Sequence, residues 1–357
     1  MKVCLLTTGL GRSDVPLALV DHVPRLIAAH GVELTVALTE RAGQDFEDQR
    51  LAGAAVAEVD DLLDERFDVA LAASWRACVH VFRVSAGSHA LYVADFEHHR
   101  YASWEPERIA AALVYDLPLD LICEARWIAA SLGELRPEAR CALAMPGVDG
   151  AGLPPPAPRP GGPLRVFVGA DGAEVSGAVL EAMTEPHELV ADVDDADVVA
   201  SLAQSDGVVN AAREAFRRGA TCVVARLERH EELVRHRWNG LVADPDDVRG
   251  AARWLDLLAR DHALLRTLQT NALETARGWP DKEAAAAALH ATLAGFASEP
   301  RGPGSEWPMR LMGDAIAHAT TLRGEVEARD EAIRRLEAEL AAASPDKPRR
   351  ARWRGRP

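Results

Sequence analysis

The chain has 357 residues, and at about 150 residues per domain this length indicates two domains. Hydrophobic residues make up 48% and charged residues 27% of the composition, a balance that can bury a core and excludes an intrinsically disordered chain. Lysine and arginine number 40 against 55 aspartates and glutamates, so the formal net charge is −15. Such an acidic body repels nucleic acid and anionic membranes, so an anionic ligand needs a local site.

Cysteine usage and hydropathy bear on the compartment. The five cysteines are widely spaced, and no CxxC pair or Cys/His cluster in the sequence indicates a zinc site. We find no secretory signal pattern, and no apolar stretch approaches the roughly 20 residues that cross a bilayer. We therefore expect free thiols and a cytoplasmic location.

Residues 1–149 alternate short apolar runs with segments of helical period. The predicted strands are Val3–Thr8, Glu33–Leu38, Asp68–Ala73, Ala90–Ala94, Asp120–Cys123 and Cys141–Met145. The predicted helices are Val15–Ala29, Trp104–Tyr115 and Arg126–Leu135. Strands that are apolar nearly throughout and alternate with helices indicate a parallel sheet covered on both faces. We expect a doubly wound, Rossmann-like α/β lobe.

A second α/β lobe is expected after a linker. Residues 150–163 are dense in proline and glycine, which neither a helix nor an interior strand tolerates. Residues 164–297 then resume the pattern, and this lobe is the shorter one. Its predicted strands are Leu164–Gly169, Glu188–Val190, Val198–Leu202 and Thr221–Ala225, and its predicted helices are Glu174–Met183, Pro245–Leu258, Asp261–Arg277 and Lys282–Phe296.

The pattern changes in residues 298–344, a loose segment followed by a heptad helix. Within residues 316–340 the seam positions are Ala319, Leu322, Val326, Ile333, Leu336 and Leu340. This seam predicts a coiled coil, and with it an oligomer, or a helix that docks on the lobes. Residues 345–357 hold six basic residues and one acidic residue. We expect a disordered tail, either simply solvated or in peripheral contact with the anionic inner face of a membrane.

The clearest chemistry lies in the second lobe, where Glu214 follows Asp206 by eight residues. If a helix opens at Gly207, the N–H groups of Gly207, Val208 and Val209 can bind a phosphate. The Glu214 carboxylate then lies about 12 Å further along the axis, a distance that suits the hydroxyls of a ribose. The spacing fits a nucleotide-sugar. The simpler alternatives are that Asp206 is only a helix cap and Glu214 only a solvent-facing side chain.

This part of the chain resembles the C-terminal lobe of the family-4 retaining glycosyltransferases, which have the GT-B fold. In that family an acidic residue and a Gly-rich turn are followed eight residues on by Glu-Ala-Met, and then by Cys-Gly-x-Pro-Val-Val-Ala. The corresponding segments here are Asp206-Gly207, Glu214-Ala215-Phe216 and Arg218–Ala225. Downstream, Glu231–Val234 and Asn239–Val242 are similar to the family's Glu-Ile-Val and Asn-Gly-Leu-Leu-Val segments.

The resemblance extends over residues 1–297. Met145–Asp149 and Arg165–Gly169 resemble the passage between the lobes of these enzymes, and Lys282–Phe296 resembles the segment that returns toward the first lobe. Tyr92–Glu97 and Glu124–Ala129 are similar to segments of the branch that adds rhamnose to bacterial surface glycans.

The resemblance implies transfer of a hexose or deoxyhexose from a nucleotide-diphosphate sugar to a hydroxyl of a glycan or lipid-linked acceptor, in glycan or cell-envelope biosynthesis. It implies a retained anomeric configuration and no metal or other cofactor, because the helix dipole and cations stabilise the leaving diphosphate. By the same resemblance Glu214 holds the ribose, Asp206 contacts the sugar as a catalytic residue, and the backbone at Gly207, Val208 and Val209 meets the diphosphate.

Two departures from the family pattern favour an alternative function without catalysis. Family members place an arginine and a lysine just after the first strand of the second lobe, whereas Gly169–Glu174 contains two acids and no cation. We expect Arg213 or a neighbouring arginine to supply the missing charge on the donor side. The second lobe is also shorter between Gly169 and Ser201, where the family usually has additional strand–helix units. The alternative is a non-catalytic GT-B subunit that binds a partner or a glycan.

Candidate residues of the first lobe follow its strands, where sites gather in doubly wound sheets. Gly9 and Gly11 follow the first strand on the expected acceptor side. The dinucleotide pattern GxGxxG is incomplete because residue 14 is Asp14, which argues against a dehydrogenase. Asp95 joins them on the acceptor side, and His98 or His99 is a candidate catalytic base near neutral pH, unless the segment is only a solvated loop.

Overall fold

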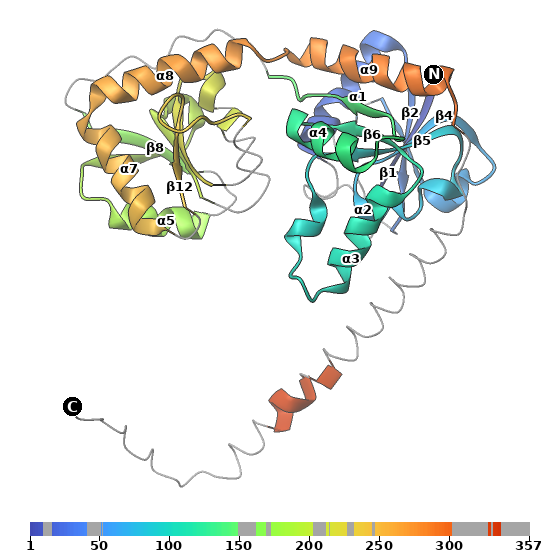
Figure 1. Ribbon diagram of the computed structural model, residues 1–357, viewed down its shortest axis with the longest axis horizontal. Coiled ribbons are helices and arrows are strands. Elements are labelled where there is room, and N and C mark those ends of the chain that lie inside the picture. The colour runs from blue at the N-terminus through green and yellow to red at the C-terminus, as the bar shows by residue number, and fades with distance from the viewer. Residues whose placement is uncertain are drawn as a thin grey trace.

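The computed structural model contains two parallel sheets covered by helices, so the predicted pair of Rossmann-like α/β lobes is confirmed (Figure 1). The structure describes residues 1–9, 16–40, 51, 53–148, 162–168, 173–202, 212–213, 215–226, 232–244, 247–301, 328–329 and 331–336.

The first lobe is built on a seven-stranded parallel sheet of order β3-β2-β1-β4-β5-β6-β7. Its strands are β1 (Lys2–Thr7), β2 (Glu33–Leu38), β3 (Ala55–Glu58), β4 (Arg66–Ala72), β5 (Ser85–Val93), β6 (Asp120–Cys123) and β7 (Cys141–Leu143). Its helices are α1 (Leu17–His30), α2 (Trp75–Cys78), α3 (Pro106–Leu113) and α4 (Arg126–Leu135). Short β3 and α2 were not predicted, since neither carries a periodic apolar pattern.

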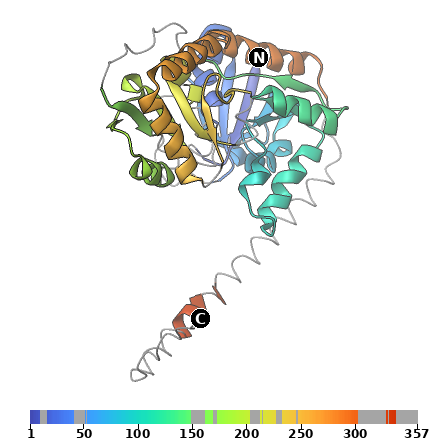
Figure 2. The ribbon, with the colours of Figure 1, turned by 60° about the vertical axis from the view of Figure 1, so that its left-hand side comes forward.

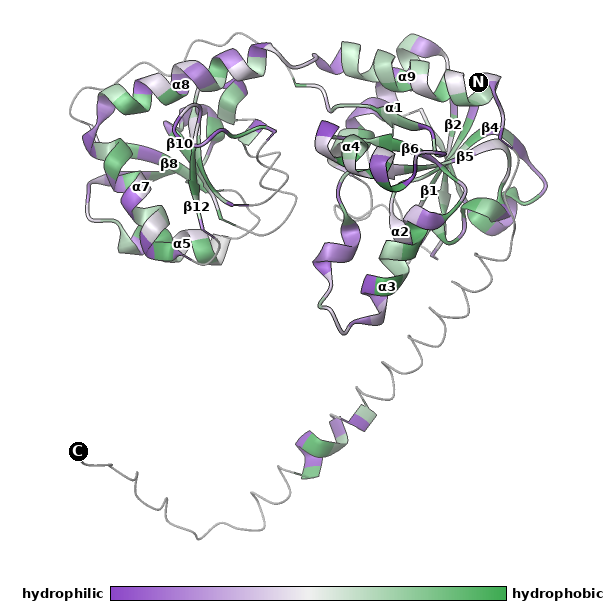
Figure 3. Ribbon diagram, in the orientation of Figure 1, coloured by the Kyte–Doolittle hydropathy of each residue, from purple (hydrophilic) through white to green (hydrophobic). Residues whose placement is uncertain are grey.

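Both faces of this sheet are buried, which is why its strands are apolar at consecutive positions. Val3 and Leu5 of β1 pack on the side of α1, whereas Cys4 and Leu6 pack on the side of α2, α3 and α4. The hydropathy colouring shows the same contrast between apolar strands and helices of mixed character (Figure 3).

The second lobe has a five-stranded parallel sheet of order β12-β11-β10-β8-β9. Its strands are β8 (Leu164–Val168), β9 (His187–Val190), β10 (Val198–Ser201), β11 (Thr221–Ala225) and β12 (Leu241–Ala243), and its helices are α5 (Ala173–Ala182), α7 (Val248–Arg260) and α8 (His262–Arg277). Helices α5 and α7 cover one face, and the C-terminal half of α8 lies on the other.

Helix α9 (Lys282–Ser298) follows α8 in the chain but packs on the first lobe, as Figure 1 shows. Leu289, Leu293 and Phe296 are buried in the same cluster as α1 and β1. From the sequence, residues up to 297 are counted with the second lobe because they follow it in the chain. In the structure, the residues from the start of α9 onward pack on the first lobe.

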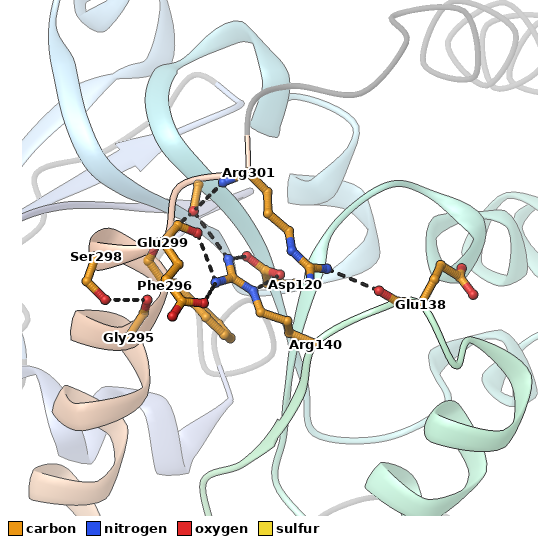
Figure 4. A network of polar contacts seen from close by, with 9 residues as sticks. Asp120, Glu138, Arg140, Gly295, Phe296, Ser298, Glu299 and Arg301 are labelled. Carbon is orange, nitrogen blue, oxygen red and sulfur yellow. Dashed lines mark hydrogen bonds and ion pairs between the residues drawn. The ribbon is translucent and has the colours of Figure 1, made fainter.

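A buried polar network holds the C-terminal end of α9 (Figure 4). Arg140 pairs with the buried carboxylate of Asp120 through Nε, at 2.7 Å, and through Nη2. Its Nη1 donates to the carbonyl oxygen of Glu299 at 2.9 Å, and its guanidinium lies 4.7 Å from the ring centre of Phe296. The Ser88 hydroxyl donates to the Phe296 carbonyl at 2.9 Å. One arginine thus joins two strands of the sheet to the end of the helix.

The chain crosses between the lobes at two neighbouring points. Val148 forms a parallel bridge with Asp281, and its N–H donates to the carbonyl of Pro280 at 3.1 Å. A Cβ on Gly147 would lie 2.4 Å from the Cα of Lys282, so only glycine allows the two segments this approach.

Of the C-terminal region, the described residues 328–329 and 331–336 are helical and lie away from both lobes in Figures 1 and 2. Ile333 and Leu336, two positions of the heptad seam, are exposed. The coiled coil and the oligomer stay predictions. The basic tail 345–357 lies outside the described residues. Among the described helices, none is long and apolar enough to span a membrane.

The first prediction concerns the crossing. Gly147→Ala should lower the free energy of unfolding by about 2 kcal/mol, because the added methyl group overpacks the backbone of Lys282. Gly133→Ala is the matched control: it lies in α4 with open space around its Cα, and should be neutral or stabilise by about 0.5–1 kcal/mol. Urea unfolding measures both, and equal stability of the two variants would contradict the close approach.

The second prediction concerns the network at the end of α9. Arg140→Met leaves Asp120 buried and unpaired, so the free energy of unfolding should fall by about 3 kcal/mol. Arg83→Met removes a similar pair with Asp60 at the surface and should cost less than about 1 kcal/mol. Thermal and urea unfolding measure the stability of both variants. If Arg140→Met loses no more free energy of unfolding than the control, the Arg140 network does not stabilise the end of α9.

Candidate functional site

The carboxyl ends of β5 and β6 bring two acidic residues together. The strands pair in parallel, with Val93 opposite Cys123, and the N–H of Glu124 donates to the carbonyl of Val93 at 3.0 Å. Asp95 follows β5 and Glu124 follows β6, and both are buried, with 6% and 9% of their surface exposed. Carboxylates at this edge of a doubly wound sheet are placed where such folds bind ligands.

The segment after β5 is held by hydrogen bonds from two other elements. The Tyr115 hydroxyl donates to the carbonyl of Asp95 at 3.2 Å and accepts from the N–H of Glu97 at 3.3 Å. The Glu97 carboxylate accepts the N–H of Trp75, at the start of α2, at 2.6 Å. Arg100 approaches Asp95, with Nε 3.8 Å from Oδ2. The segment that carries Asp95, His98 and His99 is therefore an ordered turn.

His98 and His99 lie side by side in that turn, with ring centres 4.1 Å apart. His98 is half-buried and packs against Phe96 and Tyr115, whereas His99 is exposed. Burial lowers the pKa of His98, the positive charges of His99 and Arg108 lower it further, and Asp95 opposes them. A neutral His98 near pH 7 can accept a proton.

Glu124 connects the two lobes. Arg213, in a helical segment of the second lobe, donates from Nη1 to Oε1 of Glu124 at 3.0 Å, and both side chains are largely buried. Burial raises the pKa of the Glu124 carboxyl, while the Arg213 guanidinium opposes the shift. The hydroxyl of Tyr92 is buried, and the charges of Glu124 and Arg213 both act on it.

A second contact between the lobes runs in the opposite direction. Helix α4 begins after Ala125, whose side chain cannot accept its free N–H groups. Oε2 of Glu232, from the second lobe, accepts the N–H of Arg126 at 2.9 Å and that of Trp127 at 3.2 Å. A carboxylate there satisfies two backbone donors and the positive end of the helix dipole.

Asn239 holds the turn that carries Glu232. Its side chain is fully buried, accepts the N–H of Arg235 at 2.7 Å, and donates to the carbonyl of Leu233 and the hydroxyl of Thr275 at 3.0 Å each. The next residue, Gly240, has no space for a Cβ, which would lie 2.8 Å from the Cys222 sulfur. The Asn-Gly pair read in the sequence thus shapes this turn.

The structure brings together only part of the predicted site. Asp95, His98 and His99 share one turn, and Gly9 lies at the end of β1, where its carbonyl accepts the hydroxyl of Thr7 at 2.7 Å. Arg213, expected on the donor side, is paired with Glu124. The remaining predicted residues lie outside the described part of the chain: Gly11, Asp206, Gly207, Val208, Val209 and Glu214.

Sequence reasoning missed the roles of Glu124 and Glu232, although both stand in segments quoted for the family resemblance. Glu124 had a usable signal, since it directly follows a buried strand as Asp95 nearly does. Glu232 had none, because its partners are backbone groups more than a hundred positions earlier in the chain. Among the described residues, no group of three or more His, Cys, Asp or Glu is arranged to hold a metal ion.

Comparison with known proteins shows similarity at the level of the fold. No protein-family model matches the sequence, and no curated protein matches it. A structure of HepE from Anabaena in complex with UDP and glucose superimposes with a TM-score of 0.64 at 15% identity, covering 83% of this chain and 100% of that one. Sucrose-phosphate synthase from Thermosynechococcus elongatus gives 0.63 at 13% identity, covering 84% and 100%.

A third solved structure, that of WaaG, a glycosyltransferase involved in lipopolysaccharide biosynthesis, gives a TM-score of 0.60 at 10% identity and covers 82% of this chain and 100% of that one. The neighbours are GT-B glycosyltransferases, and this chain has the GT-B fold. The predicted fold class is thereby confirmed.

The third prediction follows from the surroundings of His98. Its imidazole should titrate below the ordinary histidine pKa of about 6.5, because its burial disfavours the charged form. Asp95→Asn should lower the pKa further, since Asp95 is the group that raises it. Titration of the histidine ring resonances by NMR measures both, with the urea-unfolded chain as the reference; a His98 pKa above 6.5 would contradict the structure.

Proposed function

We propose that this chain is a glycosyltransferase that moves a sugar from a nucleotide-diphosphate sugar to an acceptor hydroxyl. The observation that carries the proposal is the match, over more than four-fifths of the chain, to GT-B structures that include HepE with UDP, with UDP and glucose, and with UDP-glucose. The cluster of Asp95, His98 and His99 at the carboxyl end of β5 is consistent with an acceptor site facing a donor lobe.

The finer assignment rests on the sequence. The eight-residue spacing of Asp206 and Glu214 supports a retaining enzyme of the family-4 type, in which Glu214 holds the ribose and the backbone at Gly207 meets the diphosphate. Such an enzyme works without a metal, because helix dipole and arginine charge stabilise the leaving group. We extend the proposal to a hexose or deoxyhexose donor, and to a glycan or lipid-linked acceptor reached from the cytoplasmic side of a membrane.

One observation favours a second candidate, a non-catalytic GT-B subunit that binds a partner or a glycan. Arg213, a candidate for the missing diphosphate cation, is engaged by Glu124, which reduces the charge it can offer to an anion. The segment Gly169–Glu174 contributes no cation either. Nucleotide binding separates the two candidates, since the subunit needs no donor.

The fourth prediction is the test. In calorimetric titrations with UDP, GDP, dTDP and ADP and their sugar derivatives, the wild-type protein should bind at least one. Glu214→Ala should weaken that binding about 10- to 100-fold, the loss expected when a charged group stops accepting hydrogen bonds from ribose hydroxyls.

Glu274→Ala, which removes an exposed glutamate of α8, is the control and should bind like the wild type. Failure of the wild-type protein to bind any of these ligands would reject the enzyme. Unchanged binding by Glu214→Ala would reject the site assignment alone.

A further inference from the structure

The loop between β6 and α4 makes both polar contacts described above with the second lobe, within three consecutive residues. The side chain of Glu124 reaches Arg213, and the backbone of Arg126 and Trp127 reaches Glu232. The contacts are reciprocal, since each lobe supplies one carboxylate and the other lobe supplies the hydrogen-bond donors. They come from two separate segments of the second lobe, so the loop holds that lobe at two points.

We propose that Glu124 and Glu232 form a latch that holds the two lobes closed, and that Glu124 positions the donor-side helical segment through Arg213. Neither residue is assigned a contact with substrate. The inference rests on the proposed function only where it refers to the donor.

The first argument is the environment of the ion pair. The side chains of Arg213 and Glu124 are 13% and 12% exposed, so their bond is weakly screened by solvent. A charge left in this place without its partner is unfavourable, because it has lost water and gained nothing in return. When the lobes separate, both groups regain water. The pair is therefore a specific contact of the closed arrangement, which opening exchanges for water.

The second argument is the position of Arg213. Residues 212, 215 and 216 of its segment pack their side chains into the core of the second lobe, whereas Arg213 points to the first lobe. Arg213 directly precedes Glu214, the proposed ribose ligand. A bond from Glu124 consequently restrains Arg213, the residue that precedes Glu214 in the sequence, and this is how a first-lobe residue can influence donor binding.

The third argument is the end of α4. Glu232 provides the capping carboxylate that Ala125 lacks, and Arg126 adds a longer contact, with Nε 3.9 Å from Oε1 of Glu232. Opening of the lobes removes the cap from the helix, and the exposed N–H groups must then find water. The two contacts strengthen each other, because either one keeps the partners of the other in place. Lobe closure and donor binding are then linked, and each favours the other to the same extent.

The fifth prediction tests the latch without nucleotide. Small-angle X-ray scattering should give a larger radius of gyration for Glu124→Gln and for Glu232→Gln than for the wild type, and the largest for the double variant. Glu134→Gln removes an exposed carboxylate from the same helix α4 and should leave the radius unchanged. Thermal melting checks that each variant is folded. Scattering curves for both bridging variants that coincide with the wild-type curve would overturn the latch.

The positioning role has a separate readout. UDP binding should weaken about tenfold in Glu124→Gln and about tenfold in Arg213→Gln, but the double variant should lose little more than either single one, because both substitutions break the same bond. Independent contributions of the two side chains to binding would give additive losses. If the wild-type protein binds no nucleotide, the proposed function fails and the scattering result alone decides the latch; if it binds UDP but the two losses add, the positioning role is wrong.

Discussion

The arrangement of the two lobes depends on the docking of α9 into the core of the first lobe. Its apolar face, with Leu289, Leu293 and Phe296, shares a cluster with α1 and the central strand β1. Because α9 directly follows the helices of the second lobe, this burial forces the chain to cross between the lobes twice. The two crossings lie against each other, where Gly147 leaves no room for a side chain beside Lys282. Two short segments in contact limit the movements that the lobes can make.

This constraint explains why one loop of the first lobe meets the second lobe. With the crossings held at one end of the interface, the carboxyl ends of β5 and β6 lie opposite the segments that carry Arg213 and Glu232. The site is therefore a composite, in which the buried carboxylate of Glu124 in the first lobe is paired with Arg213 of the second lobe. Such groups are costly to bury alone, so the same residues that shape the site also favour its closed form.

Much of the fold could be predicted because local pattern and burial agree. Strands β2, β6 and β11 and helix α4 have the bounds that periodicity predicts. Strand β3 was not predicted because it is short, half exposed and ends in glutamate. Strand β12 was not predicted because three residues are too few to show a periodic pattern. In the site, Asp95 and His98 could be found because they follow a strand. The pairing of Glu124 with Arg213 could not, since 89 positions separate them and each residue alone looks like an ordinary polar side chain.

The sequence by itself determined two α/β lobes, their linker, and a spacing of acidic residues that suits a nucleotide-sugar. Each of these features depends only on residues that are close together in the chain. The family resemblance already implied that α9 returns to the first lobe, and its burial with α1 and β1 agrees with it. Only the tertiary structure decided that Glu232 caps a helix it does not adjoin, and that Arg213 has a carboxylate partner. The physical reason is that hydrophobic burial is non-directional. Periodicity identifies a face to be covered, but the element that covers it, and the charges that then meet, depend on the packing of the whole chain.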